Sequence, residues 1–170
     1  GGRKDVWEFV RYARVPQAVR AQWDHLVGGY LGSRGALAGV VVLMDSRHPF
    51  TAHDEHLLHW LRPAGRRLLV LGDMRELGEG ADAYHAGLAD AVSASGATQV
   101  FLCGPHMQAL WQKLAPAQRG VHRPDSVALA GEFAAALRAG DVVAVKGSLG
   151  SKMKIVVDAI VAASGGEVGH

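Results

Sequence analysis

The chain has 170 residues, of which 49% are hydrophobic and 20% charged, and its formal net charge is +2. This composition is typical of one globular domain and excludes a disordered chain. The small net charge argues against a nucleic-acid partner, and no apolar run approaches the roughly 20 residues of a membrane helix, so we expect neither nucleic acid nor membrane as a partner.

The first half of the chain predicts two strands, each followed by a helix. A weak strand signal at Trp7–Val10 precedes apolar residues at helical spacing over residues 19–30. The short apolar run Val40–Met44 predicts a buried strand. A capping box at residues 51–54 then opens a helix that runs to Leu61.

The second half of the chain continues this alternation. The apolar runs Leu68–Leu71, Val100–Cys103 and Val142–Val145 predict strands buried on both faces, and a weaker strand signal surrounds Val121. Apolar residues at helical spacing fill four further stretches of the sequence. These stretches are residues 84–92, 107–114, 129–137 and 153–160.

Alternating strands and helices with short connections predict an α/β fold whose mainly parallel sheet has about five to six strands. Right-handed crossovers put helices on both faces, which makes a three-layer Rossmann-like sandwich. No repeat or low-complexity linker divides the sequence, so we expect a single domain over residues 1–170. The chain begins with Gly-Gly and no methionine, from which we expect a trimmed, tagged or excised product.

Two loops at the ends of predicted strands are the first place to look for chemistry, because ligands of parallel α/β sheets gather beyond the carboxyl ends of the strands. Asp73 and Glu76 follow the strand at Leu68–Leu71. Lys146, Gly147 and Ser148 follow the last predicted strand and lead into a helix.

A lysine before small residues at a helix entrance can hold an anion through its ammonium group and free backbone N–H groups. The helix end contributes about 0.3–1 kcal/mol when exposed, which suits weak phosphate or carboxylate binding. The alternative for Lys146 is a solvated side chain at an ordinary helix start.

Histidine and cysteine offer two further candidates, and neither predicts an active site. His53, His56 and His59 recur every three residues, but this spacing rotates the third ring away from the first, so we expect a polar helix face and no metal. Cys103 ends an apolar run, which indicates a buried inert thiol rather than a nucleophile. A single cysteine excludes an internal disulfide and indicates a reducing, cytoplasmic compartment.

From about Arg66 to Ala163 the chain resembles the C-terminal domain of the Mur ligase that adds D-alanyl-D-alanine to the cell-wall precursor in peptidoglycan biosynthesis. The matching pieces are VLGDMRELG, His85 early in the next helix, VFLCGPHMQALW and GDVVAVKGSLGSKM. The resemblance implies a domain that closes over the active site and helps bind the dipeptide and the nucleotide. The family uses ATP and magnesium, and its central ATPase domain with a phosphate loop is not in this sequence.

This resemblance assigns substrate binding to Asp73, Glu76 and the Lys146-Gly147-Ser148 run. Asp73 and Glu76 would contact the substrate amine or a metal-linked water, and His85 would buttress the acidic loop from behind. The alternative is that Asp73 caps the turn that follows it and Glu76 is solvated.

From about Tyr12 to Leu61 the chain resembles the later part of EngB-type ribosome-assembly GTPases, and the run MDSRHPFTAHD is the specific part of the match. Those enzymes need a phosphate loop of the form G-x-x-x-x-G-K-[ST], which this sequence does not contain. Their Asp-x-x-Gly switch is replaced by Glu8-Phe-Val-Arg11.

The two resemblances meet near Leu68–Leu71, at a strand that both families possess. We therefore predict a chimeric or engineered α/β hybrid that binds no cofactor and has no catalytic activity alone. One alternative is a weak nucleotide- or phosphate-binding module that takes a small anion or dipeptide. Another is a self-associating scaffold, a homo-oligomer without a ligand.

Overall fold

The structure is a computed structural model that describes residues 6–11, 37–43, 66–138, 141–163 and 168–169. The helices predicted over residues 19–30 and 51–61 lie outside the described residues, as do His53, His56 and His59. Within the described part of the chain, no helix is long and apolar enough to cross a membrane.

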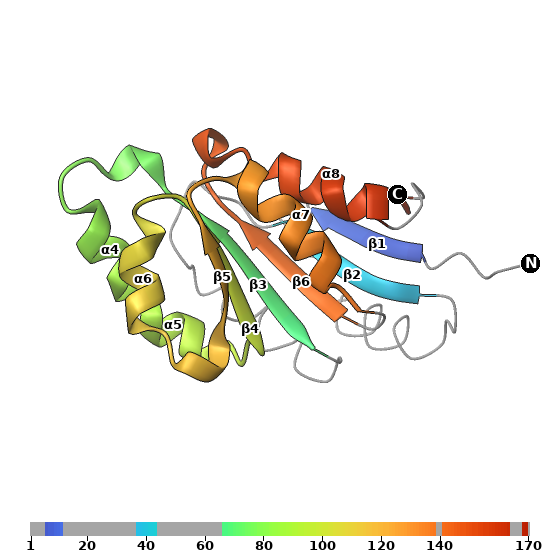
Figure 1. The fold of residues 1–170 in the computed structure, drawn as a ribbon, viewed down its shortest axis with the longest axis horizontal. Helices are drawn as coiled ribbons and strands as arrows, with labels where there is room; N and C mark the ends of the chain where they lie inside the picture. Colours follow the sequence, from blue (N-terminus) through green and yellow to red (C-terminus); the bar gives the residue numbers. More distant parts are fainter. Residues whose placement is uncertain (1–5, 12–36, 44–65, 139–140, 164–167, 170) are drawn as a thin grey trace, which may run out of the picture.

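The fold is the predicted α/β sandwich with a parallel sheet (Figure 1). The strands lie in the order β5-β4-β3-β6-β2-β1-β7, and every pair of neighbours is parallel. The strands are β1 (Val6–Arg11), β2 (Leu37–Leu43), β3 (Arg67–Gly72), β4 (Gln99–Cys103), β5 (Arg119–Arg123), β6 (Asp141–Lys146) and β7 (Val168–Gly169).

Within the described residues the sheet thus has seven strands, whereas five or six were expected. Both weak signals, at Trp7–Val10 and around Val121, correspond to strands. The additional strand, β7, has two residues, too few for a periodic pattern to predict.

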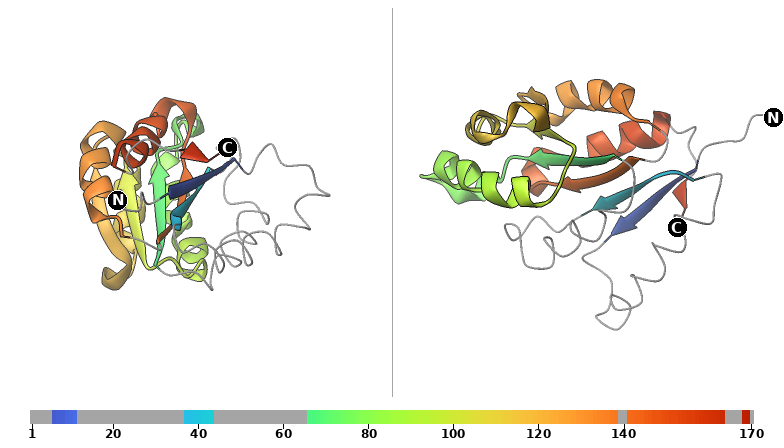
Figure 2. Two further views of the ribbon diagram at one scale, coloured as in Figure 1. Left: turned by 90° about the vertical axis from the view of Figure 1, so that its right-hand side faces the viewer. Right: turned by 90° about the horizontal axis from the view of Figure 1, so that it is seen from below.

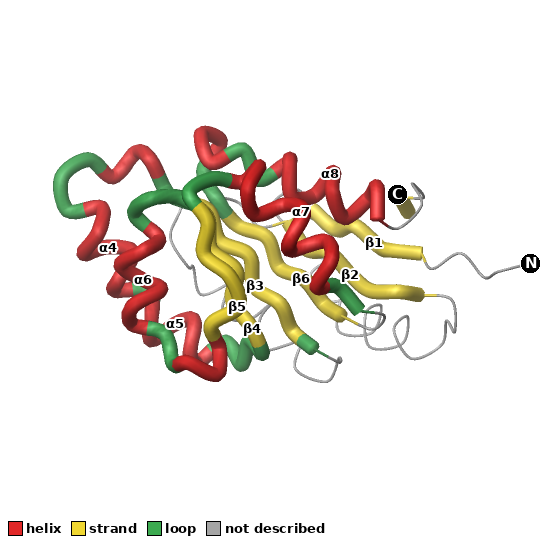
Figure 3. The backbone as a smooth tube through the Cα atoms, in the orientation of Figure 1, coloured by secondary structure: helices red, strands yellow, loops and turns green. Residues whose placement is uncertain are grey.

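Five α-helices are described, and all of them follow β3 in the chain, where α4 with α5, α6, α7 and α8 connect successive strands (Figure 3). The stretch predicted as one helix over residues 84–92 is two short helices that meet at Leu88, directly after Gly87, a residue that weakens helices. The helices are α4 (Ala81–Gly87), α5 (Ala89–Ala94), α6 (Met107–Lys113), α7 (Ser126–Ala136) and α8 (Lys154–Ala163).

The inner strands supply two layers of core because successive side chains point to opposite faces of the sheet. On one face Leu69, Leu71, Val100 and Leu102 pack with Leu88, Val92 and Leu110 of helices α4 to α6. On the other face Leu68, Val70, Phe101 and Val143 pack with Leu129, Phe133, Val156 and Ile160 of helices α7 and α8. The edge-on view on the left of Figure 2 shows α7 and α8 along one side of the sheet.

Strand β2, which belongs to the segment that resembles the GTPase, lies inside this sheet. It pairs with β6 from Gly39↔Asp141 to Leu43↔Val145 and with β1 on its other side. The described strand of the Tyr12–Leu61 segment is therefore part of one continuous sheet with the Mur-like strands.

Candidate functional site

The two loops singled out in the sequence flank a topological switch point. Strands β3 and β6 are neighbours, but β3 leads to α4 on one face of the sheet and β6 leads to α8 on the other. In open α/β sheets this divergence marks where ligands bind, outside the carboxyl ends of the two strands.

Asp73 is buried, with 2% of its surface exposed, and its carboxylate caps helix α6. Its Oδ1 accepts a hydrogen bond from the Met107 N–H at 2.9 Å, and Oδ2 accepts one from the His106 N–H at 3.1 Å. The idea that Asp73 caps the turn that follows it is therefore wrong, since the helix that it caps begins more than thirty residues later in the chain. Backbone N–H groups at a helix N-terminus are good partners for a carboxylate, so these two hydrogen bonds fix the side chain of Asp73 at the start of α6.

Gly104, the first residue after β4, leaves the space that this carboxylate fills. Its φ of +112° lies in the region that favours glycine, and a Cβ there would overlap the carboxyl carbon of Asp73. The GPH sequence that starts at Gly104 thus brings the α6 N-terminus up to the acid.

His85 supports the loop of Asp73 and Glu76 from the other side, as the sequence predicted. Its Nε2 accepts a hydrogen bond from the Met74 N–H at 3.1 Å, and Nδ1 lies 2.6 Å from the Ala81 carbonyl oxygen. Because a backbone N–H can only donate and a carbonyl can only accept, the proton is on Nδ1. The ring is fully buried, and both nitrogens are used inside the fold.

Ser148 joins the second loop to the first. Its hydroxyl donates to the Asp73 carbonyl oxygen at 2.7 Å, and Ser151 Oγ donates to the Ser148 carbonyl oxygen at 2.6 Å. Both ends of this turn are buried, so the loop after β6 is fixed onto the loop after β3.

Gly147 and Gly72 allow this turn to cross the ends of β6 and β3. A Cβ on Gly147 would lie 2.5 Å from Met153 Cγ, and one on Gly72 would lie 2.6 Å from Met153 Sδ. The two glycines therefore make room for the protein's own Met153 and Ser151.

Lys146 and Glu76 are the remaining predicted site residues. Lys146 ends β6 and is only 2% exposed, so it is not the solvated lysine of the alternative interpretation. Alternation along β6 puts it on the same face as Ala144, the face that α4 to α6 cover. Glu76 lies in the short 3-10 turn η2 (Arg75–Leu77).

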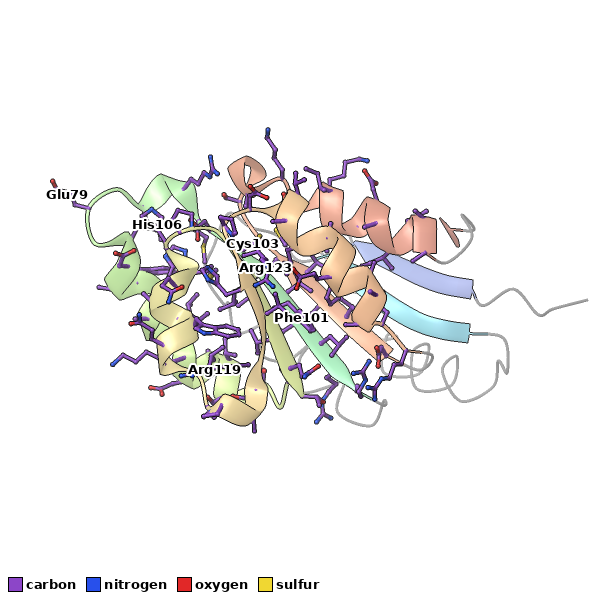
Figure 4. The ribbon with its side chains drawn as sticks, in the orientation of Figure 1. Glu79, Phe101, Cys103, His106, Arg119 and Arg123 are labelled. Atoms are coloured by element: carbon purple, nitrogen blue, oxygen red, sulfur yellow. The ribbon has the colours of Figure 1, made fainter. Side chains whose placement is uncertain are left out.

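His106 belongs to this region and was not predicted from the sequence. Its Nδ1 lies 2.7 Å from Asp82 Oδ1, an exposed pair that links the first turns of α4 and α6. Its ring stacks on His85, with centroids 5.8 Å apart and an interplanar angle of 18°. Figure 4 labels His106 and Cys103, the last residue of β4. Within the described residues, no group of three or more His, Cys, Asp or Glu could hold a metal ion.

Cys103 is the buried thiol that the sequence predicts, with 1% exposure and its Sγ 3.4 Å from Met153 Sδ. Burial, with further contributions from the negative charges of Asp73 and Asp125, raises the pKa of the thiol from 9.0 to about 12, although Arg75 opposes the shift. A thiol that keeps its proton does not act as a nucleophile at neutral pH.

The raised pKa of Cys103 predicts a loss of stability in alkali. Between pH 9 and 12 the unfolded chain releases this proton and the folded chain keeps it, so the contribution is complete below pH 9 and is lost as pH rises. We expect the free energy of unfolding to fall by about 1.4 kcal/mol between pH 8 and pH 10 from this group. Urea titrations of the protein and of Cys103→Ala measure the effect, and equal pH slopes would contradict it.

Comparison with known proteins finds two sets of relatives. The sequence profile described as Mur ligase, glutamate ligase domain, matches residues 31–149. The probable GTP-binding protein EngB of Dechloromonas aromatica is 50% identical over 60 residues, which are 35% of this chain and 27% of that protein. The EngB protein of Thiobacillus denitrificans is 47% identical over 60 residues, or 35% of this chain and 29% of that protein. The chain thus spans less than a third of these curated relatives.

Two solved structures share the fold. MurF ligase from Thermotoga maritima, determined in complex with ADP, has a TM-score of 0.55 and 19% identity over 74% of this chain and 29% of that chain. MurF from Acinetobacter baumannii has a TM-score of 0.53 and 15% identity over 69% and 28% of the two chains. The profile match starts at residue 31, upstream of the boundary expected at Arg66, so it also includes β2. Since this match covers well over half of the sequence, the chain belongs to the Mur ligase family, in its glutamate ligase domain.

Proposed function

We propose that this chain is a chimeric α/β domain, with a Mur-ligase C-terminal body and an EngB-like segment, that does not turn over ATP or GTP alone. The observation that carries the proposal is the use of Asp73. Both carboxylate oxygens accept backbone N–H groups of α6, so the acid most suited to catalysis stabilises the fold instead.

The described residues do not fit the magnesium and ATP that the Mur ligase family implies. Magnesium prefers carboxylate oxygens and retained waters, and the Asp73 oxygens are occupied by nitrogen donors. The Ser148 hydroxyl donates to a backbone carbonyl, and both nitrogens of His85 have partners. Asp73 and Ser148 instead link the loops after β3 and β6 to each other and to the start of α6.

Steady-state assays of phosphate release from ATP and from GTP test this proposal. We expect no release above that of a blank, because the carboxylate of Asp73 is engaged by the N–H groups of His106 and Met107. Activity that persists through repeated purification and disappears in Lys146→Met would contradict the proposal.

A second candidate function is weak binding of a small anion, such as a phosphate or the carboxylate of a dipeptide, beside Lys146. It is supported by the position of Lys146 at the carboxyl end of β6, next to the switch point. Because Lys146 is only 2% exposed, we expect an anion to make few contacts with it and to bind weakly.

Thermal-shift titration with ATP, GTP and D-alanyl-D-alanine separates the two candidates. An anion site predicts a saturable rise in Tm of a few degrees at roughly ten times Kd, equivalent to about 1.4 kcal/mol. Lys146→Met is expected to abolish this rise, whereas Lys152→Met, an exposed lysine of the same loop, serves as the matched control. A rise that survives in Lys146→Met shows that the site is elsewhere.

A further inference from the structure

His106 and Asp82 form a hydrogen-bonded pair where helices α6 and α4 begin. The His106 Nδ1 atom lies 2.7 Å from Asp82 Oδ1, and the two side chains are 41% and 74% exposed. His106 is the N-cap residue of α6, and Asp82 lies in the first turn of α4. Figure 4 labels His106 in this part of the molecule. The pair is therefore open to solvent, unlike the buried acid Asp73.

The partner of Nδ1 determines which nitrogen of the neutral His106 ring carries the proton. A carboxylate oxygen can only accept, so the proton is on Nδ1 and Nε2 keeps its lone pair. Within the described part of the chain, no hydrogen bond engages His106 Nε2. A histidine that a carboxylate orients in this way is suited to act as a base or a nucleophile in acyl transfer.

Other contacts limit how the His106 ring can turn. Its backbone N–H donates to Asp73 Oδ2 at 3.1 Å, which fixes the start of α6. One face of the ring stacks on His85, with centroids 5.8 Å apart and an interplanar angle of 18°. The ring of His85 is fully buried and bonded at both nitrogens, so it is a fixed support. A reactive group held in one direction loses less entropy when the reaction occurs.

We propose that His106 Nε2 is a nucleophile toward small activated acyl esters, and that Asp82 is a positioning residue that keeps Nε2 unprotonated. The exposure of the pair suits a small ester with a good leaving group. This inference goes beyond the proposed function, because it concerns acyl transfer to water and involves neither a nucleotide nor Lys146.

The reaction with an aryl ester such as p-nitrophenyl acetate has two steps. First a bond forms between Nε2 and the acyl carbon, the bond from that carbon to the phenolic oxygen breaks, and p-nitrophenolate leaves with the electron pair. The acetylated ring is positively charged and keeps its Nδ1 proton beside the Asp82 carboxylate. Water then attacks the acyl carbon, the electron pair of the Nε2–carbon bond returns to Nε2, and acetic acid and a proton are released. Ester and water are the only reactants.

His122 provides the matched control, because it is a half-buried histidine whose Nε2 has a partner. Its Nε2 lies 2.8 Å from the Gly104 carbonyl oxygen. A carbonyl oxygen can only accept, so in the neutral ring Nε2 carries the proton and has no lone pair for attack. We therefore expect His122 to contribute little to ester hydrolysis.

Release of p-nitrophenolate from p-nitrophenyl acetate by the full chain at pH 8 tests the proposal. The chain has nine histidines, so an equal share of the protein-dependent rate would be about one ninth for each. We expect His106→Gln to remove roughly half or more of this rate and His122→Gln no more than an equal share. Rapid quenching and peptide mass spectrometry should find the acetyl group on His106. A loss in His106→Gln no larger than that in His122→Gln overturns the proposal.

Two variants of Asp82 test its positioning role. The amide of Asp82→Asn donates to Nδ1 and moves the ring proton to Nε2, so we expect the share of the rate due to His106 to fall about tenfold. Asp82→Glu keeps a carboxylate and should retain most of that share. Urea unfolding checks that both variants are folded. A folded Asp82→Asn chain that is as active as the original chain overturns the proposal.

Discussion

Replacement of Asp73 with alanine is expected to lower the free energy of unfolding by about 3–4 kcal/mol. The substitution leaves the N–H groups of His106 and Met107 without their acceptors at a buried helix start. Each buried donor left unpaired costs about 1–3 kcal/mol, and charge-assisted hydrogen bonds lie at the upper end of that range. Urea unfolding followed by circular dichroism measures the change.

Asp82→Ala is the matched control for Asp73→Ala. Asp82 is also an acid beside His106, but its side chain is 74% exposed, and an exposed ion pair contributes about 0–1 kcal/mol. Asp73→Asn should lie between the two, because an amide keeps one acceptor and turns a donor toward the other N–H. Similar losses for Asp73→Ala and Asp82→Ala would contradict the capping role.

Arg66→Met is expected to lower the free energy of unfolding by about 3 kcal/mol, because it leaves the buried Asp141 carboxylate without its cation. Arg66 holds Asp141 through Nε at 2.9 Å and Nη2 at 2.7 Å, and Nη2 also donates to the Ala136 carbonyl oxygen at 2.9 Å. Asp141 is 2% exposed and accepts one further bond, from the Arg138 N–H at 2.8 Å. The pair ties the chain just before β3 to the start of β6 and the end of α7.

Arg123→Met provides the comparison for this ion pair. Arg123 also binds a carboxylate with two nitrogens, that of Glu132, but both side chains are about half exposed at 40% and 45%. Its removal should cost about 0–1 kcal/mol. A double-mutant cycle of Arg66→Met with Asp141→Asn isolates the interaction. A coupling energy near zero would show that Arg66 contributes packing alone.

Most of the fold follows from patterns that a sequence carries locally. Apolar runs of four or five residues locate the inner strands, because a parallel sheet buries both faces of each strand. Apolar residues at helical spacing locate α6, α7 and α8, because each of these helices buries one face against the sheet. β7 was missed because two residues carry no period, and the break between α4 and α5 at Leu88 was missed because apolar spacing continues through it.

The site was predicted less completely than the fold. The carboxyl ends of neighbouring parallel strands lie together, and this rule correctly predicts that the loop of Asp73 lies beside Ser148. The partner of Asp73 was not predicted, since an acid that caps a helix in another part of the chain leaves no local spacing signal. Gly104 just before Pro105 and His106 offered the one hint, because a glycine after a strand often permits close approach of another group.

Hydrogen exchange of β2 compared with β3 and β6 tests the central claim, that the EngB-like and Mur-like parts share one cooperative sheet. Strand β2 pairs on both sides, so we predict that amides of Leu37–Leu43 exchange only through global unfolding, with the same free energy as those of Arg67–Gly72 and Asp141–Lys146. Rapid exchange of Leu37–Leu43 beside protected β3 and β6 would contradict the shared sheet.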